Sequence, residues 1–286
     1  MKRFILFCGI LGFSYTVQAS SVADQLTGFK CVRSPNDDGS VCTSKDVSDV
    51  TTGFHYSQPI VMLVPDGVKQ PTSAILHLHG WRGVCGDDSV SSMLKNFGFM
   101  DQMARAQALN SVIVIPRSQG HEKNFNEELV PRFNSFTKWI NKEVGVTSLD
   151  WTITTHSGGY VPVGGILARE SQKNPDRVKI KNVVMLDATY STRDSYYDKW
   201  KTAADANPDL RVYTVSRPGR GNTATGAHML KSRLGGKHVD NITDTSSHCG
   251  IVKKDLGSAL DKIISAESSD PSAGRGESGN PGARAQ

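Results

Sequence analysis

The chain has 286 residues, 37% of them hydrophobic, and carries 33 Lys and Arg against 28 Asp and Glu, a formal net charge of +5. This hydrophobic content excludes a chain that is disordered throughout and suits one α/β domain or two smaller ones. The excess of positive charge is too small to predict a nucleic-acid partner.

The first residues have the form of a secretory signal. Met1-Lys2-Arg3 is charged, an apolar run occupies residues 4–13, and the small residue Ala19 follows. Because this run is too short to cross a bilayer, we predict cleavage after Ala19 and a periplasmic or secreted protein. Loss of Lys2 and Arg3 leaves a net charge of 5 − 2 = +3. No later segment is long and apolar enough for stable membrane insertion.

The mature chain keeps four cysteines, and an even number in an exported protein favours disulfides. Cys31 and Cys42 flank a turn-like stretch at residues 35–40, so a local bridge between them is predicted. That leaves Cys85 to pair with Cys249, and the alternative is that these two are free and buried.

Strand and helix patterns alternate along the chain. Short β-branched runs bounded by turn residues are typical of buried strands, and they lie at 60–64, 74–79, 111–115, 151–155, 183–186 and 211–215. Apolar residues spaced three and four apart predict helices at 92–109, 132–144, 161–171, 195–206, 223–234 and 254–264. This alternation predicts an α/β fold with a mostly parallel central sheet and helices on both faces.

The two ends of the mature chain differ from this pattern. Residues 20–54 are polar and hold the first cysteine pair, so we expect an N-terminal extension tied by a disulfide. Residues 55–264 would form the main domain. Residues 265–286 are rich in Ser, Gly, Pro and charged residues, with no large apolar residue, and cannot bury an apolar face, so we expect a disordered tail.

The fourth predicted strand runs directly into His156-Ser157-Gly158-Gly159. A serine at a tight turn between a strand and a helix is typical of a nucleophile elbow, whose usual pattern is G-x-S-x-G. Thr155 replaces the first glycine, which is a departure. We identify Ser157 as the candidate nucleophile.

An activated serine needs a histidine base and an acid that orients it, expected in the order Ser, acid, His. Among His228, His238 and His248, the last is favoured, because it lies in a loop of small residues before the final helix. Asp187 is the favoured acid, since it ends a predicted strand. The competing carboxylates are Asp205, Asp209, Asp240 and Asp244.

Oxyanion donors are expected from two backbone N–H groups, Gly158 after the nucleophile and Trp81 in the loop that follows His79 and Gly80. His77 and His79 alternate along a strand, but no carboxylate or cysteine stands at ligand spacing, so no metal is predicted. We expect no cofactor. Arg82, Tyr160 and Tyr190 are candidates for lining the substrate crevice.

This set of motifs, in this order, resembles the α/β-hydrolase superfamily, most of all its secreted lipase- and esterase-type members, over about residues 55–265. The resemblance implies an exported serine hydrolase that cleaves a carboxylic ester, of a small molecule or a polymer, through an acyl-enzyme. An amidase or peptidase with the same triad, acting on cell-wall or peptide substrates, is the alternative. A non-catalytic binding protein on this scaffold is the alternative of another class. The oligomeric state is not predicted.

In such a fold the loop after His79 and the loop holding His248 meet at one end of the sheet. A bond between Cys85 and Cys249 would then tie the two loops together and pre-organise the site.

Overall fold

The computed structural model describes residues 21–80, 85, 89–119, 123–171, 178–191, 193–218, 223–236 and 238–269. The predicted signal sequence and the candidates Trp81 and Arg82 lie outside these ranges.

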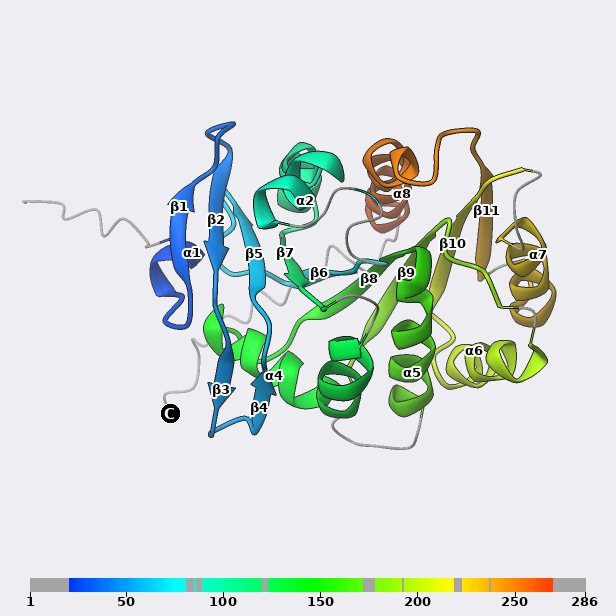
Figure 1. Cartoon of the computed structure of the whole chain (residues 1–286), viewed down its shortest axis with the longest axis horizontal. Helices are drawn as coiled ribbons and strands as arrows, with labels where there is room; N and C mark the ends of the chain where they lie inside the picture. Colours follow the sequence, from blue (N-terminus) through cyan, green and yellow to red (C-terminus); the bar gives the residue numbers. More distant parts are fainter. Residues whose placement is uncertain are drawn as a thin grey trace, which may run out of the picture.

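Nine strands within the described ranges form one sheet, in the order β1-β2-β5-β7-β6-β8-β9-β10-β11 (Figure 1). The strands from β7 to β11 in this order run parallel, and β1, β2 and β5 run antiparallel to their neighbours. Their bounds are β1 Lys30–Arg33, β2 Gly39–Thr43, β5 Ile60–Pro65, β6 Ser73–Leu78, β7 Ser111–Pro116, β8 Asp150–His156, β9 Ile180–Leu186, β10 Arg211–Ser216 and β11 Val239–Thr243. The mostly parallel sheet predicted from the sequence is confirmed.

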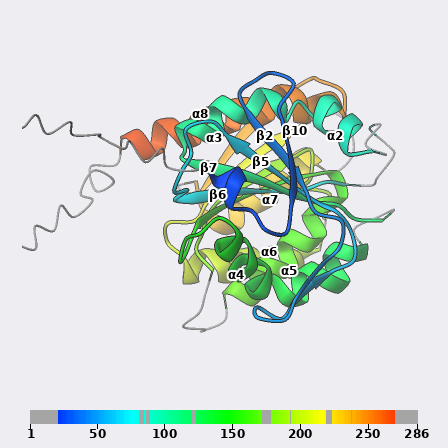
Figure 2. The same ribbon diagram turned by 90° about the vertical axis from the view of Figure 1, so that its left-hand side faces the viewer.

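Helices cover both faces of the sheet (Figures 1 and 2). Their bounds are α1 Val22–Gln25, α2 Val90–Asn96, α3 Met103–Ala108, α4 Phe133–Glu143, α5 Tyr160–Glu170, α6 Asp194–Ala206, α7 Thr223–Leu234 and α8 Gly250–Ser268. One core cluster packs α2, α3 and α8 on one face, and a second packs α4, α5, α6 and α7 on the other. Because both faces are covered, the central strands β6 and β8 are buried along almost their whole length.

The segment predicted as an N-terminal extension adds β1 and β2 to this sheet, through pairing of β2 with β5. Cys31 lies directly opposite Cys42 in the β1–β2 pair, and the two form a disulfide. A separate hairpin of β3 (Val47–Asp49) and β4 (Phe54–Tyr56) follows. None of the helices in the described ranges is long and apolar enough to cross a membrane.

Two predicted helices have different bounds. The helix expected over 92–109 is broken into α2, a short 3-10 turn and α3, because Gly98 has a φ of +66°, a left-handed value that ends a helix. The last helix starts at Gly250 and continues to Ser268, where the hydroxyls of Ser265 and Ser268 donate to carbonyls one turn earlier. The first residues of the predicted tail are therefore helical, and residues 270–286 lie outside the described ranges.

Gly226 allows α7 to pack closely on the segment after β9. A Cβ at this position would overlap the carbonyl oxygen of Thr189 and lie 2.7 Å from the hydroxyl of Tyr197. We expect Gly226→Ala to lower the free energy of unfolding by about 1–3 kcal/mol through overpacking, despite the higher helix propensity of alanine. Urea denaturation would measure the change.

Gly236→Ala is the control, because a Cβ there would meet no atom nearer than 4.0 Å. It should change the free energy of unfolding by no more than about 0.5 kcal/mol. Equal effects of the two substitutions would contradict the packing explanation.

Candidate active site

The candidate nucleophile occupies a strained turn. Ser157 has a φ of +52°, a region that costs a non-glycine residue energy and persists only when its surroundings enforce it. Buried strand β8 leads into it, and a 3-10 turn over Ser157–Gly159 leads out of it into α5. The sequence therefore places Ser157 where a nucleophile elbow requires it.

Two glycines make room for this turn. A Cβ at Gly80 would lie 2.5 Å from the Cβ of Ser157, and a Cβ at Gly159 would overlap the carbonyl oxygen of Leu78. The Thr155 departure fits the same packing, because its hydroxyl donates to the Leu78 carbonyl at 3.1 Å and lies against Gly159.

The predicted base and acid meet. His248 Nδ1 lies 2.7 Å from Asp187 Oδ2, although 61 residues separate the two in the chain. Asp187 directly follows β9 and is 2% exposed. Burial alone would raise the pKa of Asp187, but the hydrogen bond from His248, with Thr223 and Arg217 nearby, holds it below its ordinary value. The acid is therefore ionised and keeps the proton of His248 on Nδ1.

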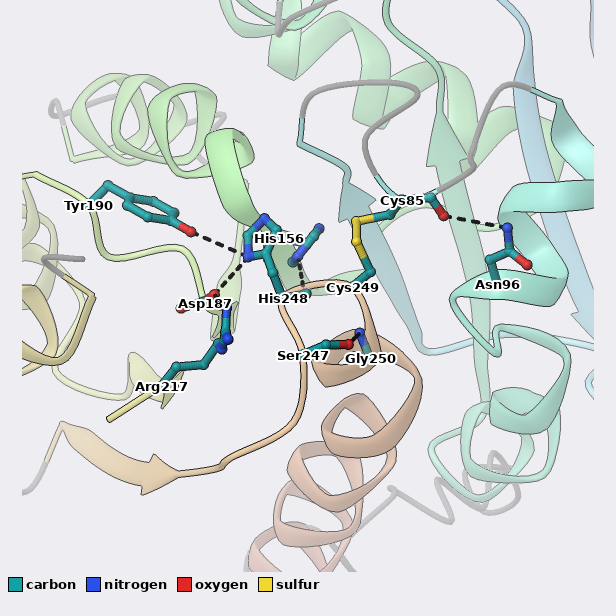
Figure 3. The surroundings of a disulfide bond; sticks show 10 residues. All are labelled: Cys85, Asn96, His156, Asp187, Tyr190, Arg217, Ser247, His248, Cys249 and Gly250. Atoms are coloured by element: carbon teal, nitrogen blue, oxygen red, sulfur yellow. Dashed lines mark hydrogen bonds and ion pairs between the residues drawn. A yellow bond between two sulfur atoms is a disulfide. The ribbon is translucent and has the colours of Figure 1, made fainter. Parts of the chain in front are cut away.

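Arg217 stands where the neighbouring strand β10 ends, and its guanidinium lies 3.8 Å from Asp187 Oδ2 (Figure 3). In the sequence this strand offers no carboxylate after it, and in the structure it supplies a positive charge that stabilises the ionised acid.

Ser157 and His248 lie at the same end of the sheet but are not hydrogen-bonded to each other in the described structure. The ring of His248 lies 4.4 Å from that of His156, the residue before Ser157. The Ser157 hydroxyl instead contacts that of Tyr190, which also lies 3.3 Å from His248 Nδ1. In ligand-free sites such hydrogen bonds are often open and close when substrate binds.

The competing residues are exposed, at the opposite end of the sheet or bound by other groups, although Asp244, which follows β11, lies at the same end as Ser157. His228 is exposed on α7. His238 precedes β11, at the end of the parallel strands opposite to Ser157, and its Nδ1 lies 2.8 Å from the Leu210 carbonyl oxygen. Asp205, Asp240 and Asp244 are bound by lysines on the surface, namely Lys201, Lys262 and Lys254.

The first residues after β6, His79 and Gly80, are fixed beside the elbow. The backbone N–H of Ser118 donates to His79 Nε2 at 3.1 Å, so Nδ1 carries the proton and donates to the Gly80 carbonyl at 2.7 Å. A Cβ on Gly80 would lie 3.1 Å from the backbone nitrogen of Gly158. The loop that continues to Trp81 therefore starts next to one candidate oxyanion donor, and Trp81 itself lies outside the described residues.

His77 is fully buried below the site, with its Nδ1 2.8 Å from the Thr154 hydroxyl and its ring edge-on to Phe99. In the part of the chain that the structure describes, no three His, Cys, Asp or Glu side chains are grouped so that they could hold a metal ion.

Tyr160 and Tyr190 are half-buried beside the elbow, with ring centroids 6.2 Å apart. Tyr160 also packs edge-on against Tyr196 of α6 at 5.4 Å. Burial and the charge of Asp187 raise the pKa of Tyr190 to about 12, so its hydroxyl stays protonated. The two predicted crevice residues thus form one aromatic wall next to Ser157.

The second disulfide joins Cys85 to Cys249, as the sequence predicts (Figure 3). Cys249 follows His248 and caps α8, while Cys85 belongs to the segment between β6 and α2. The bond therefore ties the residue after His248 to the segment that follows β6.

No family model matches the chain, and no curated protein matches its sequence. Among solved structures, it resembles a feruloyl esterase module of Clostridium thermocellum with bound sinapinate, at 12% identity and a TM-score of 0.58, over 82% of this chain and 93% of that one. An S-formylglutathione hydrolase of Agrobacterium tumefaciens is 12% identical with a TM-score of 0.53, over 82% and 98% of the two chains.

The rice cell wall degrading esterase of Xanthomonas oryzae is 8% identical with a TM-score of 0.52, over 84% of this chain and 96% of that one. The likeness lies in the fold, and the chain has the α/β-hydrolase fold that the sequence motifs predict.

The buried histidines make the fold sensitive to acid. Burial, together with neighbouring histidines, lowers the pKa of His77 well below its ordinary value of 6.5 and that of His156 to about 3. Because the unfolded chain takes up these protons near pH 6.5 and the folded chain does not, stability is present above that pH and is lost as the pH falls below it.

His156→Gln removes one of the groups that take up a proton when the chain unfolds. Between pH 6 and pH 5, the free energy of unfolding of the variant should fall less steeply with pH, by about 1.4 kcal/mol per pH unit at most. Urea titrations at several pH values would measure both slopes. Above pH 7.5 the two proteins should have equal slopes, and equal slopes at pH 5–6 as well would show that His156 is protonated in the folded protein.

Proposed function

We propose that the chain is an exported serine hydrolase that cleaves a carboxylic ester, with Ser157 as nucleophile, His248 as general base and Asp187 as the orienting acid. The observation that carries this proposal is the strained Ser157 at the end of β8, with the His248–Asp187 hydrogen bond beside it. A strained backbone costs stability and is found mostly at functional sites, and a paired histidine is the base that a serine nucleophile needs.

The charges fit the first step of acyl transfer. Because Asp187 is ionised and accepts the Nδ1 proton of His248, Nε2 of the neutral imidazole is free to accept a proton. For this step the Ser157 hydroxyl would have to move from Tyr190 to Nε2 when substrate binds. His248 would remove the proton as the oxygen attacks the ester carbonyl, and Asp187 would stabilise the resulting imidazolium.

The remaining steps follow from the same groups. The N–H of Gly158, and in our proposal that of Trp81, would hold the negative oxygen of the tetrahedral intermediate. His248 would then protonate the leaving alcohol, which leaves an acyl group on Ser157. A water molecule deprotonated by His248 would release the acid and restore the hydroxyl.

The substrate would lie against Tyr160 and Tyr190, with Arg82 as a further contact. The aromatic wall supports an acyl or alcohol group with a flat apolar face, since tyrosine rings bind such groups well. The similar structures support ester chemistry, because they are a feruloyl esterase and a rice cell wall degrading esterase. Two disulfides support export to an oxidising compartment.

The triad is tested by hydrolysis of short-chain and aromatic p-nitrophenyl esters. Ser157→Ala or His248→Ala should lower kcat by a factor of about 10⁴ or more. Asp187→Asn would leave His248 in the wrong tautomer and should lower kcat by a factor of about 10⁴. His228→Ala, at an exposed position on α7, should leave kcat unchanged.

Turnover that persists in Ser157→Ala would overturn the assignment of the nucleophile. Cleavage of the matching p-nitroanilides but not of the esters would favour the amidase or peptidase alternative. Absence of both activities in the folded parent protein would favour a non-catalytic binding protein.

The disulfide next to the base should matter for turnover. We expect the double variant Cys85→Ser/Cys249→Ser to lose about 10-fold or more in kcat under conditions where it is still folded, because the loop of His248 is then less well placed. Circular dichroism would establish folding.

The matched control is Cys31→Ser/Cys42→Ser, which removes the bond of the β1–β2 hairpin. This control should leave kcat unchanged while it is folded. Unchanged turnover in the Cys85→Ser/Cys249→Ser protein would show that the bond does not pre-organise the site.

A further inference from the structure

We infer that His156 is a positioning residue, which holds the backbone of the base His248 at a fixed position relative to the nucleophile Ser157. This inference rests on the proposed function. His156 Nε2 lies 2.8 Å from the backbone carbonyl oxygen of His248, so the residue before the nucleophile binds the main chain of the base (Figure 3).

The hydrogen bond fixes the tautomer of His156. Because a carbonyl oxygen can only accept a hydrogen bond, Nε2 of His156 carries the proton and Nδ1 is unprotonated. Burial, and next the proximity of His248, lowers the pKa of His156 to about 3, so the ring stays neutral near pH 7. A neutral ring here matters, because a second positive charge would oppose the imidazolium that forms on His248 during the reaction.

The ring of His156 packs against two other rings. Its centroid lies 4.4 Å from that of His248 and 5.8 Å from that of Phe97 in an edge-on arrangement, and the residue is 2% exposed. Phe97 follows α2 and packs in turn against Phe99. Because an imidazole confined in this way has few alternative rotamers, its Nε2–H is aimed at the His248 carbonyl before any substrate binds.

His156 connects the elements that carry the three proposed catalytic residues. In the sheet His156 of β8 pairs with Leu186 of β9. Ser157 directly follows His156 and Asp187 directly follows Leu186, so both lie at the ends of neighbouring parallel strands. His248, by contrast, lies in a loop between β11 and α8. The His156 side chain therefore attaches this loop to the same pair of strand ends that carries the nucleophile and the acid.

The disulfide and the His156 hydrogen bond hold this loop in different ways. The disulfide at Cys249 holds the residue after the base covalently, and His156 holds the base's own carbonyl by a hydrogen bond. Asp187 orients only the imidazole. Loss of the His156 bond would leave the imidazole paired with Asp187 but free to shift relative to Ser157, and a misplacement of about 1 Å can cost 100-fold in rate.

The test compares His156→Phe with His156→Gln in ester hydrolysis. Phenylalanine keeps the ring packing but removes the donor, and the side-chain amide of glutamine puts an N–H close to the place of Nε2. We expect kcat to fall about 10- to 100-fold in His156→Phe, with KM within about twofold. His156→Gln should regain most of the lost kcat. Thermal melts of both variants would show whether they are folded.

A folded His156→Phe with the kcat of the parent would overturn the inference, as would equal losses in both variants. These outcomes leave the proposed function intact, whereas turnover in Ser157→Ala would overturn that function itself. If neither variant folds, ¹⁵N spectra of histidine-labelled parent protein decide. They should show His156 neutral with the proton on Nε2 from pH 8 to pH 5, and a proton on Nδ1 instead would exclude the hydrogen bond.

Discussion

The left-handed backbone of Ser157 is the constraint on which the rest of the site depends. This conformation is unfavourable for serine and is held because β8 is buried on both faces and cannot move to relieve it. Gly80 and Gly159 are needed at the points where the turn touches the neighbouring chain, since a Cβ at either would collide with it. A buried parallel sheet thus presents one hydroxyl at its carboxyl end at a fixed position.

The electrostatics of the site follow from what surrounds this turn. Asp187 is ionised and deeply buried, and His248 and Arg217 stabilise its charge. The histidines beneath, His77 and His156, are held neutral by burial. Because a low-dielectric site strengthens the interaction of the remaining charges, a proton taken up by His248 would be stabilised chiefly by Asp187.

Much of this arrangement is predictable from the sequence, because the strands that position the site are short β-branched runs with clear ends. The elbow is identified by His156-Ser157-Gly158-Gly159, and the choice of His248 and Asp187 follows from chain order and strand ends. Strand β11 is not predicted, because Asp240 and Asn241 interrupt its apolar residues at the edge of the sheet. The break at Gly98 is missed because the apolar spacing continues across it.

The hydrogen bond of His156 is beyond the reach of sequence patterns. It joins a strand end to a loop 92 residues later, and only the folded sheet shows that the two meet. The pairing of Asp187 with Arg217 is hidden for the same reason, since a basic residue after β10 looks like part of a solvated loop. Sequence reasoning predicts the chemistry of single residues, and the fold adds the set of contacts that hold them in place.

The central claim is that Ser157 is an activated nucleophile, and covalent labelling by a fluorophosphonate tests it most directly. The mature protein, incubated with the probe and digested, should carry one adduct on the peptide that contains Ser157. The adduct should be lost in Ser157→Ala and form far more slowly in His248→Ala. A folded parent protein that takes up no probe, or an adduct on another residue, would contradict this account.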